Sequence, residues 1–116
     1  MRFALCLPWR VLTPEAKSVM DRLNRRSAMV DECLVWLGPE SGGYGTIYAF
    51  GRPRGVHIAA WMAMIGPVPE GLELDHRCEQ PLCWNVSHLQ AVTHEENSRL
   101  VQARRHARWV EWPEVE

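Results

Sequence analysis

The most reactive stretch of this 116-residue chain runs from Leu74 to Leu100. It contains Cys78, Cys83 and His88 at the spacing C-x4-C-x4-H. Two thiolates and an imidazole this close in sequence are typical of three ligands of one tetrahedral zinc ion, because zinc prefers sulfur and nitrogen donors. The fourth ligand must therefore come from another part of the chain.

The order of these residues resembles that of the His-Cys box homing endonucleases and of the related zinc-containing HNH endonucleases common in phages. The resemblance rests on Asp75-His76, the cysteine loop, and Asn97 at twenty-one positions beyond His76. Upstream segments fit the same pattern and extend the resemblance over roughly residues 30 to 100: Cys33–Gly38, Gly43–Gly45, His57 and Gly66–Gly71. The chain departs from the family pattern at Ile58, where arginine is usual, and at Val86, where proline is usual.

The resemblance implies the fourth zinc ligand. The family pattern places a cysteine just before the aromatic-glycine segment, which makes Cys33 our choice; His57 and Cys6 remain alternatives. A closed set of three cysteines and one histidine leaves no open coordination position, so this zinc is expected to be structural. We expect it to hold the loop between two strands and thereby fix the separation of His76 and Asn97.

The resemblance also implies a second site, in which a phosphodiester is hydrolysed. Such a reaction needs a water nucleophile, a base, and positive charge beside the phosphate. His76 is the general base in the resembled enzymes, and its side chain titrates near neutral pH. Asn97 offers a neutral oxygen ligand suited to Mg²⁺, and Asp75 adds a carboxylate ligand, as in HNH enzymes. An alternative assigns His76, Asn85 and His88 as the H-N-H triplet, with His88 on the catalytic ion.

Contacts to double-stranded DNA are expected from a β-ribbon and from the last helix. Local basic faces can bind phosphate even though the formal net charge is −1. The contact candidates are Tyr44, Tyr48, Arg52, Arg54, Arg99 and Arg104. The sequence does not indicate which arginine assists catalysis. The alternative to DNA contact is that these arginines are ordinary solvated residues on helix and hairpin surfaces.

The surrounding sequence predicts elements that position these groups. Thr13-Pro14 is typical of a helix start, and Cys33–Leu37 predicts a short strand. Two strands are expected at Tyr44–Phe50 and Val56-His57, joined around residues 51–55. A helix is expected at His57–Ile65, strands at Leu72–Leu74 and Leu89–Val92, and a helix from His94 to about Ala107.

The last helix begins with a capping box. Thr93 stands three positions before Glu96, which is the spacing of this motif. His94 and Glu95, in the first turn, are expected to be solvated. Strand, loop, strand and helix together match the ββα-metal arrangement of the resembled nucleases.

We therefore predict a small α+β, zinc-stabilised ββα-metal (His-Me finger) nuclease fold with an N-terminal helix and a β-hairpin. The expected organisation is an N-terminal strand and helix extension at 1–29, the nuclease domain at 30–109 and an acidic tail at 110–116. Residues 1–12 are apolar and could form a strand, with Cys6 as a buried hydrophobe. A small domain often needs a metal staple.

The predicted function is that of a DNA endonuclease that uses structural Zn²⁺ and catalytic Mg²⁺, or a similar divalent ion, and leaves 5′-phosphate and 3′-hydroxyl ends. The alternative is a non-catalytic zinc-stabilised DNA-binding module on the same scaffold. A disulfide-bonded secreted domain is a third class, disfavoured because no credible signal peptide precedes the cysteines. No run is long enough for a membrane span, so we expect a cytoplasmic protein, phage-encoded or bacterial, acting as a monomer or homodimer.

Overall fold

The computed structural model describes residues 13–114, and side chains as far as residue 107. The predictions for residues 1–12, including Cys6, lie outside the described residues. The described elements are α3 (Pro14–Arg25), β1 (Ser27–Val30), β2 (Cys33–Trp36), β3 (Glu40–Ser41), β4 (Tyr44–Ala49), β5 (Arg52–Gly55), α4 (Val56–Met64), β6 (Leu72–His76), the 3-10 turn η1 (Val86–His88), β7 (Leu89–Thr93) and α5 (His94–Glu114). The fold is α+β, as predicted.

The core lies between α3, α4 and the short sheets that surround them. The buried face of α3 consists of Ala16, Val19 and Leu23, which recur at helical spacing and pack towards α4. Helix α4 is apolar on most of its surface, and Ala59, Ala60 and Ala63 are fully buried. A short helix of this composition is stable because neighbouring elements enclose it rather than because of its own capping.

All the strand pairings within residues 13–114 are antiparallel. Strand β1 pairs with β2, β4 pairs with both β3 and β5, and β6 pairs with β7. An isolated bridge between Val35 and Cys83 then connects β2 to the loop that follows β6. Two parts of the chain about fifty residues apart are thereby held side by side.

The largest differences from the predicted elements lie in the hairpin and in the last helix, which was expected to end at about Ala107 and extends to Glu114. The helix expected at His57–Ile65 is α4 (Val56–Met64), so Val56 and His57 do not form the strand that was also expected there; the second strand of the hairpin is Arg52–Gly55, the segment expected to be the turn. Proline is tolerated there because, among the described strands, β5 lies at the edge of its sheet and pairs with β4 alone. Strand β1 was not predicted, because a four-residue strand directly after a helix carries little local signal.

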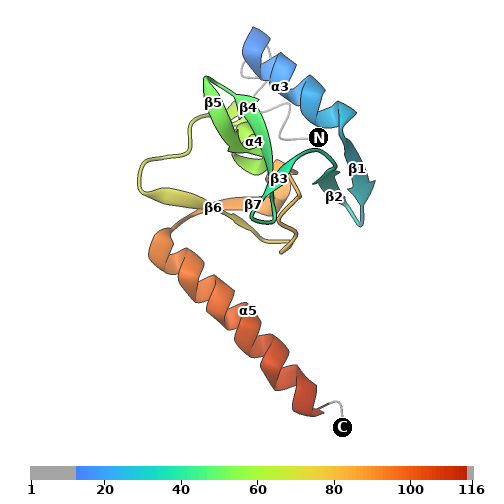
Figure 1. The fold of residues 1–116 in the computed structure, drawn as a ribbon. Coiled ribbons are helices and arrows are strands. Elements are labelled where there is room, and N and C mark those ends of the chain that lie inside the picture. The colour runs from blue at the N-terminus through green and yellow to red at the C-terminus, as the bar shows by residue number, and fades with distance from the viewer. Residues whose placement is uncertain (1–12, 115–116) are drawn as a thin grey trace.

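The chain ends in the order strand, loop, strand, helix. Strand β6 leads into the cysteine loop, β7 returns antiparallel to it, and α5 starts immediately after β7 and projects away from the body of the molecule (Figure 1). The predicted capping box is confirmed: Glu96 N–H donates to Thr93 Oγ1 at 3.0 Å, and Thr93 N–H donates to Glu96 Oε1 at 3.3 Å. Within residues 13–114, no helix is both long and apolar enough to span a membrane.

Candidate metal centre and catalytic cavity

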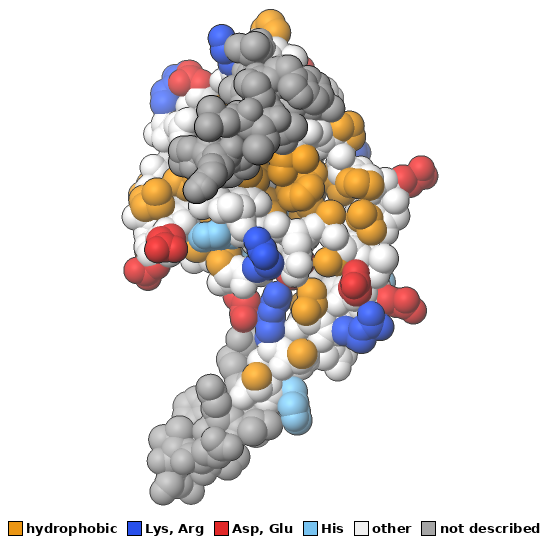
Figure 2. All heavy atoms as spheres, turned by 180° about the vertical axis from the view of Figure 1, so that it is seen from behind, with side chains coloured by type: hydrophobic (Ala, Val, Ile, Leu, Met, Phe, Trp, Pro, Cys, Tyr) orange, Lys and Arg blue, Asp and Glu red, His pale blue; other side chains and the backbone are white. Residues whose placement is uncertain are grey.

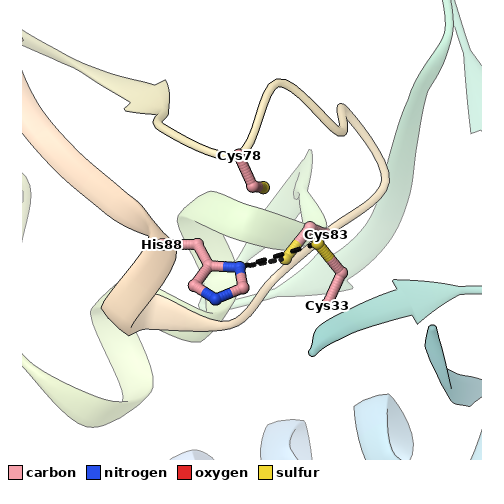
Figure 3. Close-up of side chains that lie close together, drawn as sticks. All are labelled: Cys33, Cys78, Cys83 and His88. Carbon is pink, nitrogen blue, oxygen red and sulfur yellow. Dashed lines mark hydrogen bonds between the residues drawn. The ribbon is translucent and has the colours of Figure 1, made fainter. Parts of the chain in front are cut away.

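Four metal-binding side chains converge from three parts of the chain. Their ligand atoms all lie within 4.8 Å of one another: Cys33, Cys78, Cys83 and His88. Cys33 comes from β2, the other two cysteines from the loop after β6, and His88 from η1. Figure 3 shows the imidazole of His88 facing the sulfur atoms of Cys33 and Cys83. The structure thus brings together the four residues that were predicted to hold zinc.

The geometry of this cluster suits a small soft cation. His88 Nδ1 lies 3.6 Å from Cys33 Sγ and 3.5 Å from Cys83 Sγ. Tetrahedral zinc holds sulfur at about 2.3 Å and nitrogen at about 2.0 Å, so ligand atoms spaced about 3.5 Å apart surround a centre of the right size. The donor set of three sulfurs and one nitrogen is the one that zinc prefers. The cluster could therefore bind a metal such as zinc.

Burial of the cysteines makes a bound cation favourable. Burial, together with neighbouring thiols, raises the pKa of Cys33 to about 12, and burial also raises the pKa of Cys83. Without a cation, such thiols stay protonated in a crowded apolar site. A coordinated metal supplies the positive charge that stabilises the thiolates.

Backbone bonds hold the cysteine loop against β2. Trp36 N–H donates to Leu82 O, and Trp84 N–H donates to Leu34 O, each at 3.0 Å. These bonds flank Cys83 and place its side chain beside that of Cys33.

Asn85 has a structural task in the same loop. Its Oδ1 accepts hydrogen bonds from the N–H and the hydroxyl of Ser87, and its Nδ2 donates to Glu32 O at 3.3 Å. It therefore caps η1 and ties it to the β1–β2 turn, as expected of a loop-shaping residue. His88 lies with the cysteines, so the structure gives no support to the alternative in which Asn85 and His88 join His76 in one catalytic triplet.

The three predicted catalytic residues line a cavity of about 260 Å³. Its walls come from β6, the start of β4, the cysteine loop and α5: Tyr44, Leu74, Asp75, His76, Glu79, Pro81, Asn97, Val101 and Arg104. The cavity lies outside the Cys3His cluster, which contributes none of these lining residues. Asp75, His76 and Asn97 are therefore gathered at one place, although the role of each stays a prediction.

His76 ends β6 and is held by the backbone of the cysteine loop. Its Nε2–H donates to Cys83 O at 3.0 Å, because a carbonyl oxygen can only accept. A neutral imidazole protonated at Nε2 carries its free lone pair on Nδ1. Burial lowers the pKa of His76, while the Cys83 carbonyl and the charge of Asp75 act in the opposite direction.

His57 lies against His76 rather than among the cysteines. The two rings are 4.6 Å apart between centroids, and Tyr44 lies 5.9 Å from His57 and 6.1 Å from His76. Among the described residues, Nδ1 of His57 is buried with no hydrogen-bond partner. Burial, with a smaller contribution from the charge of His76, lowers the pKa of His57 to about 4. The alternative of His57 as a ligand in the zinc cluster has no support in this geometry.

Asp75 is buried and fully hydrogen-bonded. Arg104 donates from both terminal nitrogens, to Oδ1 at 2.9 Å and to Oδ2 at 3.0 Å, and Gln90 Nε2 donates to Oδ2 at 2.9 Å. The Arg104 guanidinium, above all, holds the pKa of Asp75 below its usual value. The carboxylate of Asp75 remains charged at neutral pH, as a metal ligand must be. Both of its oxygens, however, already accept hydrogen bonds from Arg104.

Asn97 is held by a carboxylate that the sequence analysis did not single out. Its Nδ2 donates to Glu73 Oε1 at 2.7 Å, and His94 Nδ1–H donates to Glu73 Oε2 at 2.7 Å. These two bonds lower the pKa of Glu73. Glu73 could have been noticed because it stands two positions before Asp75 and so projects from the same face of the strand. The bond from Gln90 to Asp75 could have been predicted only from the register of β6 and β7, which places these two residues opposite each other.

The candidate DNA-contact residues fall into two groups. Tyr44, Tyr48, Arg52 and Arg99 are exposed. Arg54 instead donates to the carbonyls of Ala49 and Phe50 in its own hairpin, and Arg104 is engaged by Asp75. Basic and acidic side chains are interspersed on the face drawn in Figure 2 rather than gathered in one patch.

Taken together, the fold and the two sites define a small α+β domain with a candidate Cys3His metal centre beside a histidine- and carboxylate-lined cavity. Residues 54–99 match the family of HNH endonucleases. This match confirms the resemblance inferred from the sequence, and it spans His57, the cavity residues Asp75, His76 and Asn97, and three of the four cluster residues.

Relatives of the chain occur in phages. The chain is 34% identical over 70 residues to Protein 7.7 of Escherichia phage T7, and 31% identical over 77 residues to Protein 2.8 of the same phage. It is also 44% identical over 36 residues to the uncharacterized gene 5.3 protein of Enterobacteria phage T3. The alignments cover 60%, 66% and 31% of this chain, and 54%, 53% and 36% of those relatives, respectively. The chain thus spans about half the length of the two phage T7 relatives. No solved structure matches it.

Proposed function

We propose that this chain is a zinc-stabilised, metal-dependent DNA endonuclease of the ββα-metal class. The observation that carries the proposal is the shared cavity lined by Asp75, His76 and Asn97. These residues come from the end of β6 and the first turns of α5, so the fold has to bring them together across twenty-one residues. A cavity that contains a base, a carboxylate and an amide oxygen has the groups that phosphodiester hydrolysis requires.

His76 acts as the general base through Nδ1. Since Nε2–H is engaged by the Cys83 carbonyl, Nδ1 is the ring atom that can accept a proton from an attacking water. Burial keeps the imidazole neutral at physiological pH, which is the form that a base needs. The Cys83 carbonyl then stabilises the imidazolium that forms, because it continues to accept the Nε2–H bond.

Asp75 and Asn97 would hold a divalent ion such as Mg²⁺ in the cavity. Their side-chain oxygens are hard ligands of the kind that Mg²⁺ prefers. Such an ion supplies Lewis-acid stabilisation of charge on the phosphate and on the departing 3′ oxygen. Asp75 remains ionised through its pair with Arg104, and this guanidinium lies where it can also offset negative charge on a bound phosphate.

The Cys3His cluster would hold a structural zinc ion. All four positions of a tetrahedral ion are filled by protein ligands, which leaves none for water or substrate. Its contribution to catalysis is indirect: Cys83, whose thiol belongs to the cluster, also supplies the carbonyl that orients His76.

The products and context of the reaction follow from the same proposal. Cleavage by an activated water would leave 5′-phosphate and 3′-hydroxyl ends on double-stranded DNA, contacted through Tyr44, Tyr48, Arg52 and Arg99. Phage relatives favour action on DNA in the cytoplasm of an infected bacterium. One active site cuts one strand, so a monomer would nick and a homodimer could break both strands.

One observation favours a second candidate function, that of a non-catalytic zinc-stabilised DNA-binding module. Both carboxylate oxygens of Asp75 already accept hydrogen bonds, from Arg104 and Gln90. In a binding module this pair would be a permanent link between α5 and β6. A nuclease, by contrast, must make Asp75 available to the ion.

The deciding experiment is cleavage of supercoiled plasmid by zinc-loaded protein with and without added Mg²⁺, beside His76→Ala and His106→Ala. His106 is an exposed histidine on α5 that does not line the cavity, so its variant controls for loss of an imidazole. We expect Mg²⁺-dependent nicking that His76→Ala reduces at least 100-fold, the lower end of the usual contribution of a general base, while His106→Ala cleaves normally. DNA binding without cleavage by the wild-type chain would instead establish the binding module.

A further inference from the structure

We infer that Glu73 is a positioning residue that turns the side-chain oxygen of Asn97 towards the catalytic cavity. The inference rests on the proposed function, in which this oxygen ligates a divalent ion. Asparagine is an ambiguous ligand, because its amide carries an oxygen and a nitrogen of almost the same size on the same carbon. Only the oxygen can bind a cation.

The bond between the two side chains removes this ambiguity. An ionised carboxylate accepts hydrogen bonds but cannot donate them. The amide atom that lies 2.7 Å from Glu73 Oε1 must therefore be the NH₂ group. Because the nitrogen of Asn97 is fixed on Glu73, its oxygen points to the other side of the amide group. This oxygen is then available to bind an ion in the cavity that Asn97 lines.

Glu73 stands behind Asn97 rather than in the cavity itself. It is absent from the residues that line the cavity. Its other carboxylate oxygen accepts the Nδ1–H of His94 at 2.7 Å. Both oxygens are thus engaged by α5, which makes Glu73 a support for Asn97 rather than a third oxygen ligand.

The strand register explains why Glu73 can reach this position. Glu73 and Asp75 are two residues apart on β6 and so project from the same face of the strand. That face meets α5, where Glu73 bonds Asn97 and His94 while Asp75 bonds Arg104. One face of β6 therefore supplies both a proposed ligand and the residue that orients the other ligand.

The test measures Mn²⁺ affinity from the electron paramagnetic resonance signal of free Mn²⁺. Mn²⁺ is titrated with the zinc-loaded protein of all 116 residues. We expect Glu73→Ala to weaken Mn²⁺ binding about tenfold, at the lower end of the effect of removing a residue that supports a metal ligand. Glu73→Gln should retain most of the affinity, because its amide oxygen still accepts the Asn97 Nδ2–H bond. Zinc content and circular dichroism establish that each variant is folded.

Two further variants separate orientation from charge. Glu95→Ala also removes one negative charge, from an exposed side chain in the first turn of α5. Within the described residues, no hydrogen bond joins Glu95 to Asn97. The Mn²⁺ affinity of this variant should therefore equal that of the wild type. In an Asn97→Ala background, Glu73→Ala should cause no further loss, because Glu73 acts through Asn97.

The outcomes distinguish this inference from the proposed function. If Asn97→Ala weakens Mn²⁺ binding but Glu73→Ala does not, the positioning role is wrong while the ion site stands. An equal loss from Glu73→Ala with and without Asn97 would show direct or purely electrostatic action, and would also overturn it. If Asn97→Ala leaves Mn²⁺ binding unchanged, the assignment of Asn97 as a ligand fails, and the role of Glu73 fails with it.

Discussion

The rings of His57 and His76 lie against each other, and His76 lines the proposed catalytic cavity. The rings of His57 and His76 lie 4.6 Å apart, and both are buried. Two positive charges at this separation in a partly dehydrated site repel each other, so protonation of one opposes protonation of the other. The pair therefore favours the neutral form of His76, which is the form that the proposed mechanism needs.

His57 should make the stability of the fold sensitive to mild acid. Its pKa is about 4 in the folded chain and 6.5 in the unfolded chain. The unfolded state thus binds more protons between these values, and stability falls as the pH is lowered from 6.5 towards 4. The full pKa shift of His57 corresponds to a decrease in the free energy of unfolding on the order of 3 kcal/mol.

His57→Phe tests this effect, because phenylalanine keeps the ring and removes both the titration and the unpaired Nδ1. Urea unfolding of both proteins between pH 4 and 7.5 should show a smaller acid-induced loss in the variant. Zinc content measured at each pH restricts the comparison to conditions in which both proteins keep the metal. The same loss of stability in both proteins would rule out His57 as its source.

At the scale of elements, Trp36 explains why glycine stands both before the β3–β4 hairpin, at Gly38, and within β4, at Gly45. Its ring is 2% exposed, and its Nε1–H donates to Pro39 O at 2.9 Å. A methyl group added to Gly38 or Gly45 would lie 2.4 Å from atoms of this ring. The two glycines thus leave the space into which the indole packs, which joins β2 to the β3–β4 hairpin.

Gly45→Ala should therefore destabilise the fold by about 1–3 kcal/mol, the usual range for overpacking. The backbone of Gly45 does not have positive φ, so the effect would come from contact with Trp36 and with Val56, whose Cγ2 would lie 2.9 Å away. Urea unfolding with zinc present measures the loss. In Gly45→Ala/Trp36→Ala, the absence of the ring should make the combined loss less than the sum of the two single losses; strict additivity would contradict the steric explanation.

Local signals predicted the helix starts and the members of the metal cluster better than the strand boundaries. Thr13 does cap α3, accepting from Ala16 N–H at 3.2 Å, and the capping box at Thr93 starts α5, because both motifs depend on neighbouring residues. The position of β5 depends instead on its pairing with β4. No pattern within residues 51–55 shows that pairing.

The same contrast applies to the candidate site. Three of the cluster residues could be predicted from spacing within one loop, whereas Cys33 could be chosen only through the family resemblance. The bonds from Arg104 to Asp75 and from Asn97 to Glu73 depend on how α5 crosses β6. A single sequence does not specify that crossing, so the bond between Arg104 and Asp75 was not predicted.

At the scale of the whole molecule, the Cys3His cluster joins parts of the fold that lie far apart in the sequence. It links β2, the loop after β6, and η1. The same loop supplies the carbonyl that orients His76 and leads through η1 into β7 and α5. Loss of order at the cluster should therefore spread to the catalytic cavity.

Removal of zinc should unfold much of the chain rather than only inactivate it. Metal binding can contribute on the order of 10 kcal/mol in small zinc modules, which is comparable with the whole stability of a domain. We expect purified protein to contain one zinc per chain, and a strong chelator or Cys83→Ser to cause loss of helical circular dichroism and of the cooperative thermal transition. Cys6→Ser is the matched control and should keep both zinc and the transition, since Cys6 is not our choice of ligand. A chelated protein that still melts cooperatively at the same temperature would show that hydrophobic packing, not the metal, holds β2, the cysteine loop and η1 together.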